Sequence, residues 1–318
     1  MRLLTATALA AAIALAAGPV SAQQIGIGTM GQGTSGYSMG SAIAKLLGEK
    51  AQLGAVVQPA AGTSAYLPLL DSGELDFGIA NVLETEAALN GEAPFNRKLE
   101  NVRMVAILFP FRAGIFARKD SGIVKVTDLK GKRVAYGFTS QVTLKLLTDA
   151  FLANGGLTPS DIEPVLVPNV VRGADEVASG GADAAMFAIG SGKVSEVDAS
   201  VGGVQFIEMS DDPQAVAAMQ KIAPPTYITV VQPAPNLAGI SKPIKTMAYD
   251  YALLAGKHVS DKVVEQVVKT LAENKQALVE SFAPFRGFAP DKMAKPLKAT
   301  YHPGAVAYYK SQNQWPPK

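Results

Sequence analysis

Short apolar runs alternate along the chain with segments in which apolar residues recur at helical spacing. Met39, Ile43 and Leu46 repeat at that spacing after the first run, and Leu147 and Phe151 do so later. Because residues three to four positions apart share one face of a helix, both segments are predicted to be helical. Helices that alternate with β-branched runs are typical of a covered sheet, so an α/β fold is predicted. The predicted strands are 25–29, 55–58, 77–80, 104–109, 114–118, 133–136, 165–167, 184–188 and 227–231.

Two lobes are expected, because the chain of 318 residues exceeds the usual length of one domain. Pro110 separates two predicted strands and marks the expected first crossing between lobes. A second crossing is expected within 233–243, where Pro, Gly and Asn are frequent. The segments 244–254, 261–274 and 275–282 then show helical periodicity and are predicted to be helices. These crossings assign 23–111 with 243–318 to lobe 1, and 112–242 to lobe 2.

The N-terminus has the pattern of a cleavable export signal. Arg2 precedes an apolar stretch over 3–17, and the small residues Ser21 and Ala22 end a site that can be cleaved before Gln23. Residues 1–22 are therefore predicted to be a signal peptide, which places the mature protein in the periplasm. The apolar stretch is shorter than the roughly 20 residues needed to span a bilayer.

Composition excludes several classes of site. The chain has no cysteine, which removes disulfides, thiolate catalysis and cysteine-bound zinc. Its 29 Lys and Arg against 27 Asp and Glu are dispersed, and aromatic residues make up 7% of the sequence. Such a balance lacks the basic surface and the stacking platforms of nucleic-acid-binding proteins. We expect a monomer that binds no nucleic acid.

A glycine-rich turn follows the first predicted strand. It reads Gly31-Gln32-Gly33-Thr34-Ser35-Gly36 and leads into an amphipathic helix. Glycines allow close approach of a ligand, and a helix start favours an anion, so this turn is predicted to cradle a carboxylate or phosphate. A dinucleotide-binding fingerprint is the rival interpretation, because the turn also reads G-x-G-x-x-G. The acidic residue that should end the next strand is missing, since that strand ends at Gln58-Pro59, and no cofactor is expected.

Several further segments carry a resemblance to a known family. They are the run Ile27 to Gly33 leading to Tyr37 and Gly40, Leu69 to Asp76, Gly181 to Ala185, and His302-Pro303-Gly304-Ala305 with Tyr308-Tyr309-Lys310. In order and spacing they resemble the TAXI family of TRAP-transporter solute receptors, across the whole mature chain. The resemblance implies a type II-like periplasmic binding protein fold, in which each lobe is a mixed sheet flanked by helices. It also implies a two-crossing hinge and delivery of a small organic anion to sodium-coupled TRAP membrane subunits.

Candidate ligand contacts in the first lobe follow the predicted strands. The first turn supplies Thr29, Gly31, Gln32, Gly33, Ser35 and Tyr37. Thr63 and Ser64 follow the second strand, and Asn81 follows the third. Open α/β sheets bind ligands at this edge, although all three residues could instead cap helices.

The second lobe offers an opposed set of residues. Thr139 and Ser140 follow the strand 133–136 and would either contact the ligand or cap a helix. Phe187 is expected either to line the cleft or to belong to the core. Tyr227 is expected either to close the cleft or to be an ordinary aromatic residue of a strand. A cation for the anion is expected at Arg112, because a guanidinium binds a carboxylate in bidentate fashion, with Arg172 as the competing choice.

Catalytic chemistry finds little support in the sequence. There is no G-x-S-x-G elbow, and the two histidines, His258 and His302, are far apart in the sequence. No catalytic residue and no metal site are therefore predicted. A solute receptor is the favoured function, with an exported sensor module or an exported hydrolase as the alternatives.

Overall fold

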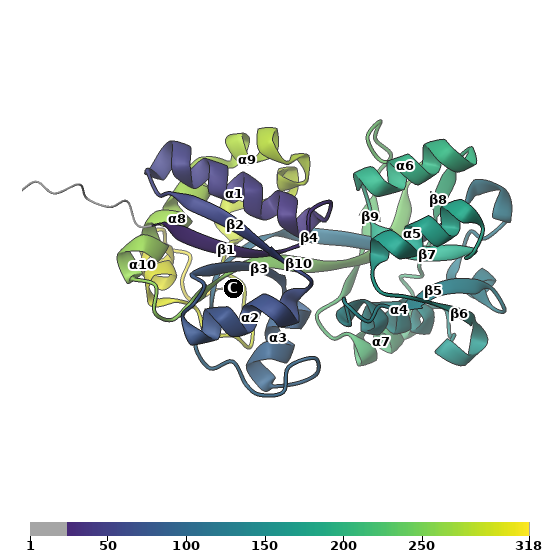
Figure 1. Cartoon of the computed structure of the whole chain (residues 1–318), viewed down its shortest axis with the longest axis horizontal. Coiled ribbons are helices and arrows are strands. Elements are labelled where there is room, and N and C mark those ends of the chain that lie inside the picture. Colours follow the sequence, from purple (N-terminus) through teal and green to yellow (C-terminus); the bar gives the residue numbers. More distant parts are fainter. Residues whose placement is uncertain (1–23, 318) are drawn as a thin grey trace, which may run out of the picture.

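The computed structural model describes residues 24–317 as two lobes joined by two long strands (Figure 1). The first lobe opens with β1 (Ile25–Met30), α1 (Ser35–Ala51), β2 (Ala55–Ala60), α2 (Thr63–Ser72), β3 (Phe77–Asn81) and α3 (Val82–Asn90). The second holds β5 (Arg133–Gly137), α4 (Thr143–Asn154), β6 (Glu163–Val167), α5 (Val170–Ser179), β7 (Ala184–Ala188), α6 (Gly192–Val201), β8 (Val204–Phe206), α7 (Pro213–Ile222) and β9 (Tyr227–Val231). The chain returns to the first lobe in α8 (Asp261–Glu273), α9 (Lys275–Ser281) and α10 (Pro303–Ser311). The expected signal peptide lies outside the described residues.

The two connecting strands are β4 (Val102–Arg118) and β10 (Ile244–Gly256), which lie side by side and antiparallel. Over 244–248, β10 pairs with β9 of the second lobe, and over 251–255 it pairs with β3 of the first. Beyond its pairing with β10, β4 pairs with β7 and β8. The two strands predicted on either side of Pro110 are thus one continuous strand that passes from lobe to lobe.

The prediction of a helix over 244–254 was wrong, because this segment forms β10. Nearly every side chain of β10 is buried, since the strand lies between β3 and β4 inside the sheet. An apolar run buried on both faces lacks the alternation of a half-exposed strand, and periodicity alone cannot distinguish it from a buried helix. The segment 233–243 joins β9 to β10 within the second lobe. We therefore propose that the second lobe boundary runs through the middle of β10.

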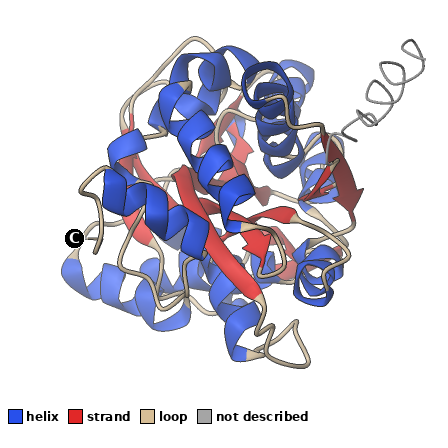
Figure 2. Ribbon diagram, turned by 90° about the vertical axis from the view of Figure 1, so that its left-hand side faces the viewer, coloured by secondary structure: helices blue, strands red, loops and turns tan. Residues whose placement is uncertain are grey.

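All the strands form one sheet in the order β2-β1-β3-β10-β4-β7-β5-β6, with β8 on β4 and β9 on β10. Within the first lobe β1, β2 and β3 are parallel, and within the second β5, β6 and β7 are parallel. Helices cover both faces of the strands (Figure 2). Because parallel strands end at the same edge, the loops after them gather at one edge of each lobe.

Two hydrophobic clusters support this arrangement. The larger one includes Ile43 and Leu47 of α1 and extends along the connecting strands into the second lobe, where it includes Leu147 and Phe151 of α4. The smaller one lies wholly within the second lobe, around Phe116. The helical periodicity predicted for α1 and α4 is confirmed, since their apolar faces are the buried ones.

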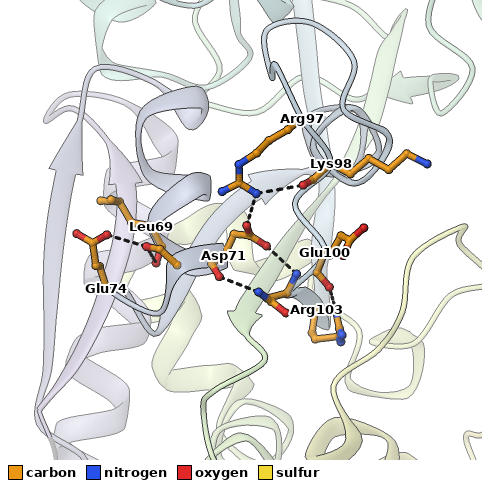
Figure 3. A network of polar contacts seen from close by, with 9 residues as sticks. Leu69, Asp71, Glu74, Arg97, Lys98, Glu100 and Arg103 are labelled. Carbon is orange, nitrogen blue, oxygen red and sulfur yellow. Dashed lines mark hydrogen bonds and ion pairs between the residues drawn. The ribbon is translucent and has the colours of Figure 1, made fainter.

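Asp71, near the end of α2, holds the long loop between α3 and β4 in place (Figure 3). Its carboxylate accepts the Asn101 backbone N–H at 2.7 Å and pairs with Arg97 at 2.5 Å. The Asn101 side chain donates in return to the Asp71 carbonyl oxygen at 3.0 Å. The same loop carries Pro94 and Phe95, between the end of α3 and Arg97, and both line the pocket described below.

Replacement of Asp71 by alanine is expected to lower the free energy of unfolding by about 1–2 kcal/mol, because the Asn101 N–H loses its charged acceptor. Urea unfolding followed by circular dichroism measures the change. Arg97→Ala is the matched control and should cost less than about 1 kcal/mol, because the Arg97 side chain is largely exposed. Equal costs for the two variants would contradict this account of the loop.

Candidate functional site

The loop after β1 is organised by Thr34, which caps α1. Thr34 Oγ1 donates to the Gly31 carbonyl at 2.7 Å and accepts the Tyr37 N–H at 3.2 Å. Gly33 has a φ of 84°, in the left-handed region that glycine adopts without strain. Gln32 Nε2 donates to the Tyr37 hydroxyl at 3.4 Å. The expected anion cradle is therefore a turn whose helix start is already occupied by the Thr34 hydroxyl.

Thr29 and Ser35 take different places beside this turn. Thr29 is fully buried, its hydroxyl donates to the Met30 carbonyl at 2.9 Å, and its methyl group packs against Gly40 of α1. Ser35 is the first residue of α1 and is half-buried. Thr29 thus fills the space between β1 and α1, and ligand contact by either residue stays a prediction.

Among the described α-helices of nine or more residues, two begin without a side-chain cap. They belong to α2, which follows Gly62, and to α4, which follows Val142. Every other described α-helix of nine or more residues has a capping side chain. An uncapped helix start leaves backbone N–H groups unpaired at the positive end of the helix dipole. The Ala65, Leu144 and Lys145 N–H groups already donate to backbone carbonyls, which leaves those of Thr63 and Ser64 in α2 and Thr143 in α4 for a ligand.

A narrow pocket lies between these two helix starts, and residues of both lobes line it. Gly62 and Ser140 meet there so closely that a β-carbon at position 62 would lie 2.8 Å from the Ser140 carbonyl oxygen. The pocket volume is about 10 Å³, room for about one water molecule. A larger solute therefore enters only when the lobes move apart. The lining residues are Gly62, Thr63, Ser64, Glu84, Pro94, Phe95, Ser140, Gln141, Val142 and Thr143.

Thr63 carries the polar atom in this pocket that most needs a partner. Thr63 is 4% exposed, and its Oγ1 has no partner with hydrogen-bond geometry in the described chain, although it lies near enough to the Glu84 carboxyl to lower the pKa of that group. Ser64 and, across the pocket, Ser140 are exposed. The structure thus brings together three of the residues expected from the sequence, while Thr139 lies just outside. Neither Thr139 nor Ser140 caps α4, because two further residues precede the helix start.

Asn81 caps α3 and positions Glu84, a pocket residue that the sequence analysis did not consider for this site. The Asn81 side-chain oxygen accepts the Glu84 N–H at 2.9 Å, and Asn81 Nδ2 donates to Glu84 Oε2 at 2.7 Å. Burial raises the pKa of the Glu84 carboxyl, and the Thr63 and Thr143 hydroxyls nearby partly offset this effect. Asn followed by Glu three positions later was the available signal, because it is a helix-start pattern.

Arg112 and Tyr227 lie on the other face of the connecting strands from this pocket. Both residues pair with Ala248 of β10. Asn81 pairs with Tyr251, which lies an odd number of positions after Ala248 in the same strand. Successive side chains of a strand point to opposite faces, so Tyr251 faces the Asn81 side and Arg112 does not. Burial lowers the pKa of Arg112. The structure does not bring the expected guanidinium to the pocket.

The remaining candidates of the second lobe have partners elsewhere. Tyr227 donates its hydroxyl to Asp250 at 3.1 Å. Phe187 is 5% exposed and packs in the smaller hydrophobic cluster, and its contact with a ligand stays a prediction. Arg172 pairs with Glu176 one helical turn away at 2.6 Å. None of these side chains lines the pocket between the lobes.

A larger hollow of about 510 Å³ lies within the second lobe, beside the end of α4 and the start of α7. Its most buried polar side chain is Asn154. The Asn154 Nδ2 donates to the Ser210 carbonyl oxygen at 2.9 Å, and its Oδ1 accepts the Ser210 N–H at 2.8 Å. The start of α7 is capped by Asp212. Because these groups already have partners, we place the candidate site in the smaller pocket.

The histidines have structural roles. His302 Nδ1 accepts the Gly304 N–H at 3.2 Å and caps α10, and burial lowers the pKa of this imidazole. His258 lies 3.2 Å from Asp76. Over residues 24–317, acidic and histidine side chains form no group of three suited to a metal ion. The same residues include no helix long and apolar enough to cross a membrane.

Solved structures share this architecture at low sequence identity. PhnD1 from Prochlorococcus marinus, in complex with methylphosphonate, is 12% identical, with a TM-score of 0.57 over 92% of this chain and 98% of that one. A binding protein component of an ABC phosphonate transporter from Pseudomonas aeruginosa is 11% identical, with a TM-score of 0.54 over 83% and 79%. A histidine kinase sensor domain with similarity to periplasmic binding proteins is 16% identical, with a TM-score of 0.50 over 84% and 97%.

These likenesses confirm the expected fold, a mixed α/β arrangement of the type II-like periplasmic binding protein class. The sequence itself gives the family. The family model described as NMT1-like matches residues 27–312, which is most of the described chain, and we conclude that this chain belongs to the NMT1-like family.

Proposed function

We propose that the chain is an exported solute receptor that captures a small organic anion between its lobes and delivers it to the membrane subunits of a TRAP transporter. The observation that carries this proposal is the pocket where the uncapped starts of α2 and α4 face each other beside the unpartnered Thr63 hydroxyl. Helix starts bind the oxygens of carboxylates and of phosphorus and sulfur acids through backbone N–H groups. Binding requires no chemical step, so the chain is proposed not to be an enzyme.

Capture and release would use the connecting strands as a hinge. Within residues 24–317, only β4 and β10 carry the backbone directly from lobe to lobe, and the pocket in its present form is too small for a solute. Bending of these strands would open the cleft, and closure would bury the solute against donors from both lobes. The predicted signal peptide and the resemblance to TAXI receptors support a periplasmic location and a TRAP membrane partner.

Thr63→Val is expected to weaken binding of the solute about tenfold, because valine keeps the shape of threonine and removes a hydrogen bond of about 1.5 kcal/mol to a charged acceptor. The melting temperature without solute should stay the same or rise, since the substitution removes a buried hydroxyl that lacks a partner. A thermal-shift screen of carboxylates, amino acids, sulfonates and phosphonates identifies the solute, and calorimetry measures the affinity.

Thr270→Val is the matched control, because Thr270 is also buried but donates only to the Gln266 carbonyl of its own helix α8. Its affinity for the solute should equal that of the unaltered protein. Equal affinity of the Thr63 variant would place the solute elsewhere, and recovery of an altered solute would favour the hydrolase.

A sensor module is the second candidate, and the fold shared with a histidine kinase sensor domain favours it. The two candidates differ in the membrane partner. Co-purification of the solute-loaded protein with TRAP membrane subunits, and sodium-driven uptake of the solute by vesicles that contain those subunits, are expected for the receptor. Binding of the solute without either result would favour the sensor.

A further inference from the structure

Glu84 is a carboxyl in the pocket that the proposed function does not use. It lies in the first turn of α3 and lines the pocket together with Thr63 and Thr143. Its Oε2 accepts a hydrogen bond from Asn81 Nδ2 at 2.7 Å. The carboxyl group is thus fixed in orientation where the two lobes meet.

Glu84 has no cationic partner within the described part of the chain. No Lys, Arg or His nitrogen of residues 24–317 lies within ion-pair distance of its carboxylate. Its neighbours include Tyr66, Tyr249 and Tyr251, and its negative charge helps to raise the pKa of each of these phenols. Glu84 is half-buried in this form of the protein. A carboxylate that closure of the lobes takes out of water without a cation is costly, and such groups in proteins are usually paired.

One side of the pocket therefore suits a negatively charged group and the other side suits a positively charged group. The starts of α2 and α4 offer backbone N–H groups and suit an anion. Glu84 is the one ionisable residue among the ten described residues that line the pocket, and it suits a cation. A solute with only negative groups would bring like charges together beside Glu84, which disfavours binding.

We propose that the captured solute is zwitterionic: its acid group binds at the starts of α2 and α4, and its protonated amine binds the Glu84 carboxylate. This inference rests on the proposed function. It narrows the solute class from organic acids in general to amino acids, aminosulfonic acids and aminophosphonic acids. The amine would supply the cation that Glu84 lacks. Closure of the lobes would remove the pair from water, and the attraction between the two charges would then be stronger.

The test uses pairs of acids that differ only in the amine. Suitable pairs are glutamate with glutarate, aspartate with succinate, alanine with propionate, and aminomethylphosphonate with methylphosphonate. Calorimetry at pH 7 measures each pair against the unaltered protein and Glu84→Gln, whose amide oxygen can still accept the Asn81 bond. At least one amine-bearing member should bind the unaltered protein tenfold or more tightly than its partner, and in Glu84→Gln this ratio should fall below about threefold.

Two further variants separate charge from structure. Glu86→Gln is the matched control, because Glu86 lies in the same helix outside the pocket, and the preference should be unchanged. Glu84→Asp keeps the charge and should keep the sign of the preference, even if Glu84→Gln folds poorly. Equal binding of the paired acids, or an unchanged ratio in Glu84→Gln, would overturn this inference and leave the proposed receptor intact. Absence of binding by every acid of the panel would overturn the proposed receptor as well.

Discussion

Gly62→Ala is expected to weaken solute binding by about 1–3 kcal/mol, roughly 5- to 150-fold, while changing the melting temperature of the solute-free protein little. The added β-carbon would lie 2.8 Å from the Ser140 carbonyl oxygen, a backbone atom of the opposite lobe. The backbone of Gly62 is extended, with a φ of −174°, so alanine adopts it without strain. Opening of the lobes relieves the clash, and the variant should therefore resist closure rather than unfold.

Calorimetry measures the loss of affinity, and small-angle scattering measures closure as a decrease in the radius of gyration when solute is added. The control is Gly48→Ala in α1, where no atom lies within 4 Å of the added carbon. It should bind normally and gain about 0.5–1 kcal/mol of stability, because alanine is the better helix former. Normal affinity and normal compaction in the Gly62 variant would show that closure does not bring these two loops together.

Gly304→Ala is expected to lower the free energy of unfolding by about 3 kcal/mol, the upper part of the range for overpacked sites. Gly304 lies in the first turn of α10, and an added β-carbon would lie 2.2 Å from the Asp261 carbonyl oxygen and 2.9 Å from the Asp261 Cα atom. Both atoms belong to the backbone at the start of α8. Since neither can rotate away, α10 must move from α8 or the chain must lose the contact.

Urea unfolding measures this cost. Gly192→Ala is the control, because Gly192 also begins a helix but meets no atom within 4 Å, and its stability should change by less than about 1 kcal/mol. A cost for Gly304→Ala no larger than that of the control would mean that α10 packs less closely than described. Solute affinity of the folded Gly304 variant should be unchanged, since the residue is not among those that line the pocket.

The close contact at Gly304 also explains one motif of the sequence. His302-Pro303-Gly304-Ala305 contributed to the family resemblance, and in the structure it fixes the start of α10 against α8. Gly40 has a similar role, because an added β-carbon there would lie 2.4 Å from the Thr29 methyl group. These residues of the resemblance are thus explained by packing between elements and not by contact with a solute.

Much of the fold could be predicted from local patterns. The limits of β7 and β9 agree with the predicted segments, and β1, β2, β3, β5 and β6 differ by only one or two residues at an end. The loops after β2, β3 and β5 were also expected to gather near a site, and Thr63, Ser64 and Ser140 do meet there. The failures were β10, whose burial on both faces comes from its place in the sheet, and β8, which has only three residues.

The sequence by itself determined most of the elements, because hydrophobic period and turn residues act over a few positions. The tertiary structure alone decided which helix starts remain without a cap and on which face of the connecting strands Arg112 lies. It also decided that Glu84 enters the pocket with no cation from the described residues beside it. Each of these depends on residues from distant segments, and the sheet register that brings them together is a property of the whole chain. Charge and burial at the pocket could therefore be known only from the folded molecule.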